Sequence, residues 1–229
     1  MKFNDARRLL AGVALTAAAL LAPQANAADM IDPATGYPIY VSIFGGASFL
    51  DNVKGNYVSS SGSVAYGASL NTKTGYLIGG AIGVNWNDFI RTEVELSHSS
   101  WKAKSLTTSG GSSSNASGHV NATYLLGNVW LDLHNSTPLT PYIGGGLGMA
   151  WASEKISGTG LFSSNDKDSG FAFQLGAGVK YDLTDAVSID LGYRYKDVSN
   201  LDFSTTLGGV LKGADLHSHN IQLGLTFQF

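Results

Sequence analysis

Apolar and polar residues alternate along most of the chain with a period of two, the pattern of a β-strand whose two faces meet different surroundings. The alternation is clearest in the last segment, which places five residues on one face: Ile221, Leu223, Leu225, Phe227 and Phe229. Seven earlier segments repeat the pattern with varying strength, at residues 38–49, 74–86, 89–101, 119–133, 140–154, 171–182 and 187–196. The sequence therefore predicts an all-β chain of eight strands.

For one of these strands, the sequence pattern does not determine the register. In segment 119–133 the apolar Tyr124 and Trp130 share a parity with the polar Asn128 and Asp132. Each face of this strand thus mixes both kinds of residue. The pattern predicts the strand but does not decide which of its faces points inward.

The connections between the strands alternate between short and long. The short links lie at residues 86–88, 134–139 and 183–185. The long links are rich in Ser, Gly, Asn, Thr and Lys, and lie at about residues 50–73, 102–118, 155–168 and 199–214. Consecutive antiparallel strands gather all short turns at one end and all long loops at the other. Short periplasmic turns and long extracellular loops are typical of membrane barrels, so we predict an eight-stranded antiparallel up-and-down transmembrane β-barrel.

Alternation alone does not say whether the apolar face points inward, as in a soluble lipocalin-like barrel, or outward to lipid. Aromatic residues near the strand ends of the apolar face favour lipid, because interfacial girdles have this composition. The polar face carries glycines and charges of both signs, which can neutralise one another inside a narrow barrel. We therefore predict a charge network in the lumen, made of Arg91, Glu93, Glu95, Asp132, Lys180, Asp182, Asp190 and Arg194.

The first residues have the pattern of a targeting signal. Basic residues precede an uncharged apolar run at 9–22, and a small-x-small motif follows. The run is too short for a spanning helix, which needs about 20 residues, so we favour a signal peptide over an N-terminal membrane anchor. The residues that define the cleavage are Ala25, Ala27 and Ala28. The expected organisation is a signal peptide (1–27), a short periplasmic segment (28–36) and a transmembrane barrel (37–229).

The composition narrows the function classes. The chain has no cysteine, which excludes a disulfide framework and thiolate metal sites. Its formal net charge is −3, without a basic patch, so a nucleic-acid partner is not expected. Glycine is abundant, with 29 residues, and only 14% of residues are charged, which suits a β-rich chain with closely spaced backbones. No cofactor is predicted.

Several motifs carry a resemblance to a known family, and their order along the chain is what makes it specific. They are the C-terminal strand ending in Phe229 and the segments Tyr40–Phe49, Glu93–Ser97, Pro141–Gly148 and Gly192–Tyr195. Over most of residues 37–229 the chain resembles the small porin-family outer-membrane barrels that include major surface antigens. These barrels are related in architecture to OmpA/OmpX-type barrels.

The resemblance implies a location and a set of partners. The location is the outer membrane, where lipids are the main partner. In the family the C-terminal strand is read by the barrel-assembly machinery, a role that would fall on Leu225, Phe227 and Phe229. Periplasmic chaperones would accompany the export. The long loops would present a surface-exposed, antigen- or adhesin-like face to a host or surface ligand.

Two local motifs resemble known binding or catalytic sites. The run Gly144–Gly148 looks like a phosphate-binding loop, but it lies in a strand pattern with no helix following, so we expect close backbone packing instead. The triplet His217-Ser218-His219 contains a serine and two histidines. A catalytic serine needs a histidine within reach and an acid to orient it, and no acid is placed on the outer face nearby. A pair of histidines at i and i+2 is half a metal site.

We therefore predict a protein that is not an enzyme, with no catalytic, cofactor-binding or metal-binding residues. An eight-stranded barrel is just wide enough for side chains to fill it, so the lumen is expected to be plugged. Two alternatives stay open: a narrow passive diffusion channel and a barrel enzyme that modifies lipid A.

Overall fold

The computed structural model describes residues 38–58, 64–108, 113–158, 163–204 and 210–229. The expected signal peptide and its cleavage site lie outside these residues. All described secondary structure is β-strand, in ten strands. They are β1 (Ile39–Leu50), β2 (Val53–Val58), β3 (Val64–Thr72), β4 (Gly75–Asn85), β5 (Ile90–Thr108), β6 (Ser113–Asp132), β7 (Leu139–Gly158), β8 (Ser163–Thr184), β9 (Val187–Ser204) and β10 (Val210–Gln228).

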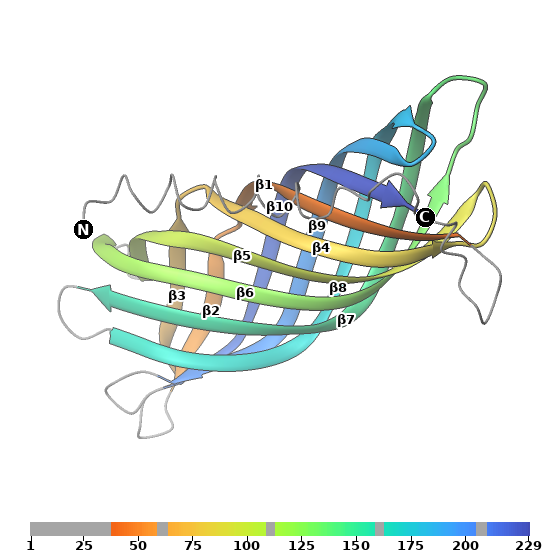
Figure 1. The fold of residues 1–229 in the computed structure, drawn as a ribbon. Helices are drawn as coiled ribbons and strands as arrows, with labels where there is room; N and C mark the ends of the chain where they lie inside the picture. The colour runs from red at the N-terminus through yellow and green to blue at the C-terminus, as the bar shows by residue number, and fades with distance from the viewer. Residues whose placement is uncertain (1–37, 59–63, 109–112, 159–162, 205–209) are drawn as a thin grey trace, which may run out of the picture.

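Eight of the ten strands form a closed antiparallel ring in the order β1-β4-β5-β6-β7-β8-β9-β10. The ring closes because β1 also pairs with β10, from Tyr40 opposite Gln228 to Leu50 opposite Ser218. The short turns and the C-terminus lie at one end of the barrel, and the far ends of β7 and β9 lie at the other (Figure 1). The prediction of an eight-stranded up-and-down barrel is confirmed.

Strands β2 and β3 form a hairpin that extends the barrel wall beyond the far ends of β1 and β4. Strand β2 follows β1 after two residues, and β3 precedes β4 after two residues. Strand β2 pairs with the upper part of β10, and β3 pairs with the upper part of β5. The hairpin therefore continues the first two ring strands rather than adding new members to the ring.

The long links predicted from composition are largely strand, and in this respect the prediction was wrong. Strands β5, β6, β7, β8, β9 and β10 have 18 to 22 residues each and run through most of three segments assigned to loops, 102–118, 155–168 and 199–214. The fourth, 50–73, is largely occupied by β2 and β3. The polar residues that suggested loops face outward, while small apolar residues such as Ala103, Ala116 and Ala214 face inward. Alternation between small residues of similar polarity is weak in sequence, which explains the error.

An apolar belt surrounds the half of the barrel next to the short turns. Its members are large apolar side chains exposed on the outer wall: Ile78, Ile82, Val94, Leu96, Leu125, Val129, Ile143, Leu147, Leu175, Leu191, Ile221 and Leu223. Strand β4, with 11 residues, spans this belt. At about 3.3 Å per residue and a tilt of about 40°, such a strand rises about 28 Å, close to the apolar band of a membrane barrel.

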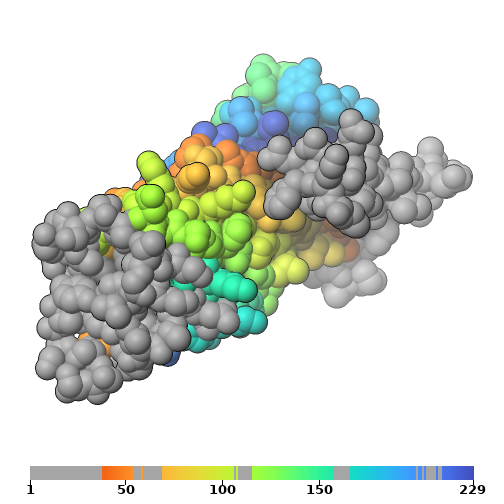
Figure 2. Space-filling model, turned by 90° about the vertical axis from the view of Figure 1, so that its left-hand side faces the viewer, coloured from red at the N-terminus to blue at the C-terminus, as the bar shows by residue number. Residues whose placement is uncertain are grey.

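Strands β1, β4 and β5 lie side by side in one continuous wall in the space-filling view, where they are orange, yellow and yellow-green (Figure 2). In the described part of the chain, no helix is long and apolar enough to cross a membrane.

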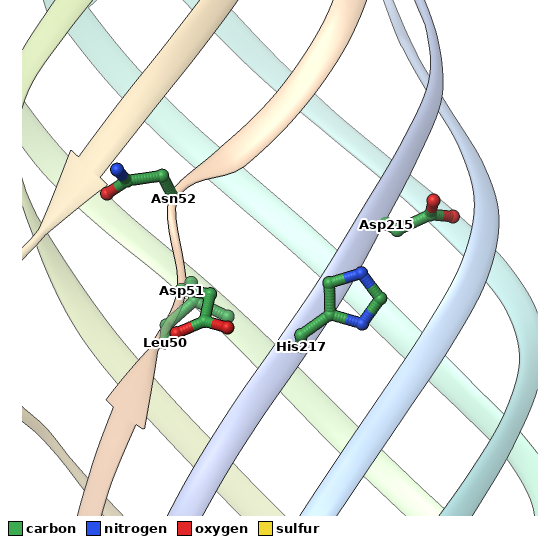
Figure 3. A pocket seen from close by; sticks show the side chains of 5 residues that line it. All are labelled: Leu50, Asp51, Asn52, Asp215 and His217. Carbon is green, nitrogen blue, oxygen red and sulfur yellow. The ribbon is translucent and has the colours of Figure 1, made fainter.

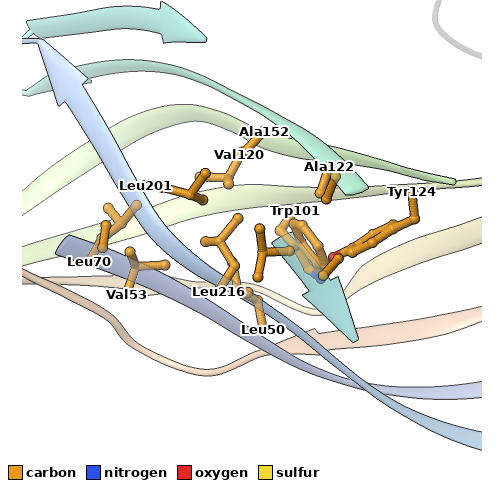
Figure 4. Packing of buried hydrophobic residues seen from close by; sticks show 14 of the residues in the cluster. Leu50, Val53, Leu70, Trp101, Val120, Ala122, Tyr124, Ala152, Leu201 and Leu216 are labelled. Atoms are coloured by element: carbon orange, nitrogen blue, oxygen red, sulfur yellow. The ribbon is translucent and has the colours of Figure 1, made fainter. Parts of the chain in front are cut away.

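The lumen is divided into two halves of opposite polarity. In the half inside the apolar belt, polar and charged side chains are buried beside aromatic ones. They include Glu95, Asn128, Gln174, Arg194, Lys196, Tyr40, Trp130 and Tyr142. In the half toward the far strand ends, a hydrophobic core fills the barrel (Figure 4). Its larger members are Leu50, Val53, Leu70, Trp101, Val120, Tyr124, Leu126, Ile156, Val198, Leu201 and Leu216.

The open register of segment 119–133 is settled by strand β6. Tyr124, Asn128, Trp130 and Asp132 are all buried in the lumen, while Leu131 on the other parity is 47% exposed. Polar and apolar residues share the inner face because β6 runs through both halves of the lumen. The mixture that made the register ambiguous is therefore a property of the fold.

Candidate functional site

Two places in the barrel concentrate polar chemistry. One is the charged half of the lumen, where the sequence placed its network. The other is a cluster of histidine, tyrosine and aspartate side chains on the outer wall, directly above the apolar belt.

The centre of the lumen network is the ion pair between Lys196 of β9 and Glu95 of β5, on opposite sides of the barrel. Both side chains are buried, with exposed fractions of 0% and 4%. Lys196 also donates to Ser97 Oγ at 2.8 Å, and Gln174 Nε2 donates to Glu95 Oε2 at 2.8 Å. Because buried charges are costly without partners, this set of contacts neutralises both groups. Sequence reasoning placed Lys196 on the polar face but left it out of the network.

A second group of contacts surrounds Glu93, which lies on the same face of β5 as Glu95, two residues closer to the short turns. Tyr40 OH and Trp130 Nε1 each donate to a Glu93 carboxylate oxygen at 2.8 Å. Arg91 Nη1 lies 4.0 Å from Glu93, and Arg91 Nε donates to Asp132 Oδ1 at 3.0 Å. The three strands that supply these residues, β1, β5 and β6, are thereby connected on the lumen side.

Asn128 joins the two groups. Its side-chain nitrogen donates to Glu93 Oε1 at 2.9 Å and to Glu95 Oε2 at 3.1 Å. Its side-chain oxygen Oδ1 accepts a hydrogen bond from Gln174 Nε2 at 2.6 Å. The result is one continuous network across the barrel.

The remaining predicted network residues lie nearer the short turns. Arg194 donates to Tyr142 OH at 2.9 Å, and its guanidinium stands 4.2 Å from the centroid of the Trp130 ring. Asp190 and Lys180 line a small lumen cavity together with Arg91 and Arg194. Lys180 pairs with Asp182 at 3.8 Å, where the Asp182 side chain is 41% exposed at the rim.

The lumen cavity has a volume of about 30 Å³, close to the share of one water molecule in the liquid. Glycines on the inner wall make room for the large side chains that fill the rest. A Cβ on Gly144 would lie 2.7 Å from the Trp130 ring, and one on Gly176 would lie 2.5 Å from the Arg194 side chain. The run Gly144–Gly148 therefore serves close packing, as expected.

The outer-wall cluster centres on Asp197 of β9. This residue lies opposite His217 of β10 and forms an ion pair with its Nδ1. Asp197 is 4% exposed, although it has the outward parity of its strand. Ser199 Oγ donates to Asp197 Oδ1 at 2.8 Å, and Tyr195 OH donates to Oδ2 at 3.4 Å. The expectation that no acid stands near these histidines on the outer face was wrong, because the acid is supplied by the neighbouring strand.

The arrangement is not that of a serine nucleophile activated by histidine. Ser218 is fully buried on the lumen side, where its hydroxyl accepts from Asn220 at 3.3 Å. The Ser199 hydroxyl donates to the carboxylate rather than to an imidazole. Within the described ranges, no group of three or more His, Cys, Asp or Glu side chains is placed to hold a metal ion.

A cavity of about 470 Å³ adjoins this cluster (Figure 3). It is lined by Leu50, Asp51, Asn52, Asp215 and His217. Asp51 and Asn52 form the junction between β1 and β2, and Asp215 and His217 lie on β10 beside it. The pairing of β1 with β10 ends at Leu50 and resumes with β2 only at Asn56, so the cavity lies where the two strands separate.

The C-terminal strand completes the ring. Leu225 and Phe227 pair with Ile43 and Val41 of β1, and Phe229 N donates to Ile39 O at 2.9 Å. These three C-terminal residues lie at the end of the barrel that carries the short turns. Their predicted role in assembly stays a prediction.

Comparison with known proteins gives a consistent result. A family model described as outer membrane protein beta-barrel domain matches residues 12–229. The outer membrane protein PagN of Salmonella typhimurium is 29% identical over 220 residues, which cover 83% of this chain and 90% of PagN. A candidate adhesin of Rickettsia bellii is 25% identical over 205 residues, which cover 82% of this chain and 86% of that protein.

Some relatives are longer than this chain. Proteins of Brucella abortus without an assigned function are 35% identical over 151 residues. The match covers 56% of this chain and 53% of theirs, so it spans about half the length of these curated relatives.

Among solved structures, the outer membrane protein OprG of Pseudomonas aeruginosa has the same fold, with a TM-score of 0.59 at 13% identity. The superposition covers 83% of this chain and 96% of OprG.

Proposed function

This chain belongs to the outer-membrane β-barrel protein family, and we propose that it serves as a structural, surface-presenting barrel with an adhesin-like role. It is an integral outer-membrane protein, with its short turns on the periplasmic side and its far strand ends outside the cell. The observation that carries the proposal is the filled lumen. Charged, polar and aromatic side chains fill one half and a hydrophobic core fills the other, which favours display over transport.

The relatives support an adhesive role for the exposed end. The Rickettsia bellii protein that aligns over most of this chain carries the name of an adhesin. Six strands continue well beyond the apolar belt, so their far ends lie away from the lipid. A stiff, polar-walled extension of this kind is suited to contact a host matrix or another cell.

Catalysis is not part of the proposal. The serine hydroxyl next to the histidine cluster is engaged by Asp197, and the second serine points into the lumen. The second candidate function is a narrow diffusion channel. Conduction would require the Glu95–Lys196 ion pair to separate so that a continuous passage forms through the lumen.

Adhesion and conduction can be tested in the same protein. We expect non-adherent cells that express the full chain to bind immobilised host matrix, and cells in which residues 109–112 and 159–162 are replaced by Gly-Ser linkers to lose this binding. Replacing the short turn 134–137 in the same way is the matched control. Planar bilayers with the purified barrel should show no steady conductance. Adhesion equal in all three strains, or a steady ohmic conductance, would contradict the proposal.

We further propose that Phe229 acts in assembly and that export removes residues 1–27. Deleting Phe229 should lower the inserted amount in cells and leave refolding of purified chain into detergent nearly unchanged. N-terminal sequencing of the exported protein should begin at Ala28. Normal membrane levels of the truncated chain would leave Phe229 with an anchoring role only.

A further inference from the structure

The cavity on the outer wall lies at a defined height. On the outward face of β10, Ile221 and Leu223 belong to the apolar belt, with exposed fractions of 52% and 63%. Moving outward along the same face, His219, His217 and Asp215 follow. The cavity therefore begins directly above the belt, at the level where lipid headgroups of the outer leaflet meet water.

Among the side chains that the structure describes, the polar groups that line the cavity are hydrogen-bond acceptors and groups that both donate and accept. Asp51, Asp215 and the amide of Asn52 line it, together with His217. Asp51 Oδ2 also lies 3.6 Å from His219 Nε2. Hydroxyl and ammonium groups are the ligand groups that these carboxylates can accept from.

The imidazole of His217 is held in a fixed orientation. Its Nδ1 faces the buried carboxylate of Asp197 and lies 3.1 Å from Tyr195 OH. The remaining polar atom of the ring is Nε2, and the residue borders the cavity. A carboxylate that orients an imidazole in this way prepares its second nitrogen for a ligand.

Aromatic rings continue from the cavity along the outer wall. The rings of Tyr195 and His217 are stacked, with centroids 6.3 Å apart and an angle of 11° between the planes. The His219 ring lies 5.4 Å from Tyr195 and 6.1 Å from Tyr193, whose hydroxyl meets His219 Nδ1 at 2.6 Å. These hydrogen bonds fix the rings, so they present a preorganised surface that is apolar in its faces and polar at its edges.

A sugar ring matches this combination. Its C–H faces pack on aromatic rings, and its neighbouring hydroxyl groups each need an acceptor or a donor, which carboxylate, amide and imidazole provide. The cavity volume of about 470 Å³ falls within the usual range of small-ligand pockets, about 300–1,000 Å³. We infer that the cavity between the β1–β2 junction and β10 binds an uncharged or amino-bearing sugar ring at the height of the outer-leaflet headgroups.

This site goes beyond the proposed adhesive role, because it lies on the barrel wall and not at the strand ends. The sugar can come from the lipopolysaccharide of the same membrane or from a glycan of another cell, and the chemistry of the ring is common to both. Loss of adhesion on linker replacement would therefore be independent of sugar binding at the wall.

The test uses the full mature chain, refolded into detergent micelles free of lipopolysaccharide. Titration with methyl glucoside, N-acetylglucosamine and glucosamine, followed by ligand-observed NMR, should show saturable binding of at least one sugar at about millimolar concentration. Asp51→Ala and Asp215→Ala should each weaken binding about tenfold, because a sugar hydroxyl loses its acceptor. Asp185→Ala, an exposed carboxylate in a short turn, is the matched control and should bind as the unaltered chain does.

Circular dichroism and urea midpoints verify that each variant is folded before its binding is compared. The inference is wrong if none of the sugars binds saturably, if both cavity variants bind as well as the control, or if glucose 6-sulfate binds more tightly than the neutral sugars. Displacement of the bound probe by lipopolysaccharide core oligosaccharide would assign the site to the surrounding membrane. Displacement only by host-type oligosaccharides would assign it to another cell.

Discussion

The two halves of the lumen are built from the same strands but hold opposite contents. On β5, Glu95 points into the charged half while its neighbour Leu96 faces out and is 58% exposed. On β10, Leu216 points into the hydrophobic half while its neighbour His217 faces out. Along β10, which runs through both halves, the polarity of both faces reverses at the level of the outer-wall cluster. The reversal follows from the surroundings of the wall.

Where the wall meets lipid, its outward residues are already in an apolar medium, and the interior is free to hold hydrogen-bonded polar groups. Where the wall meets water, the apolar residues have to be buried inside, as in a soluble sheet packing on its own core. One closed sheet thus encloses two kinds of interior along its axis. One is polar, as in a membrane barrel, and the other is apolar, as in a soluble protein. The two should respond differently to substitution.

The largest effect is expected in the charged half. Lys196→Met would leave the buried Glu95 carboxylate without its cation and should lower the free energy of unfolding by about 3–5 kcal/mol. Urea unfolding in lipid vesicles measures this. The double variant Glu95→Gln/Lys196→Met should recover part of the loss, because removing both charges leaves no uncompensated ion. A double variant as unstable as the sum of the single ones would show that the pair is not coupled.

In the hydrophobic half, a single substitution should lower the free energy of unfolding by less, and a second substitution should not restore it. Leu216→Ala should cost about 2–4 kcal/mol, since it leaves a cavity in a packed core. In contrast to the ion pair, adding Leu201→Ala from the same core should deepen the loss and restore nothing (Figure 4). Recovery of stability in this double variant would abolish the distinction between the two halves.

Substitutions on the outward face of the charged half should change the free energy of unfolding only slightly. Thr92 accepts a hydrogen bond from Trp86 Nε1 at 2.8 Å on the wall next to lipid. Thr92→Leu gives up this bond and adds apolar surface to the belt, so the net change should stay within about 1 kcal/mol in the same unfolding experiment. A loss as large as that of Lys196→Met would mean that residue 92 faces the lumen.

The smallest effect is local and depends on pH. The pairing of β8 with β9 ends at Ala172 opposite Val198, and beyond it the Asp166 carboxylate accepts the backbone N–H of Ser204 at 2.7 Å. Hydrogen bonds from the backbone of Ser204 and Lys167 lower the pKa of Asp166. This contact therefore stabilises the strand ends above the ordinary aspartate pKa of about 3.9, and the stabilisation is lost as the pH falls through the lowered value.

Hydrogen exchange at the Ser204 amide, corrected for its intrinsic pH dependence, should lose protection in that acidic range. In Asp166→Asn the protection should no longer vary with pH, while the exchange of amides in β6 should be the same in both proteins. Protection at Ser204 that is constant in the original chain would contradict the role of the carboxylate.

Much of the fold was predictable, because lipid imposes a strict alternation on the strands of the charged half. Residues such as Val94 and Leu96 could be assigned to the outer wall from parity alone. The upper half obeys the same period, but its inward residues are often alanine or serine, which contrast weakly with the polar outer face. Composition therefore suggested loops where β5 to β10 continue as strands.

The sites divide in the same way. The charges of the lumen share one parity along single strands, so Arg91, Glu93 and Glu95 could be selected from the sequence. The partner of His217 could not, because Asp197 lies on another strand and is brought opposite His217 by the pairing register of β9 with β10. A contact across strands depends on that register, which the pattern of one strand does not contain.

The length of the strands has a consequence for what a passing molecule first encounters. Strand β8 has 22 residues, twice the 11 residues of β4, which span the apolar belt. The additional residues correspond to a rise of about 28 Å at about 3.3 Å per residue and a tilt of about 40°. The barrel therefore acts as a rigid pedestal. It lifts its outermost residues clear of the lipid headgroups, within reach of antibodies and receptors too large to approach the bilayer itself.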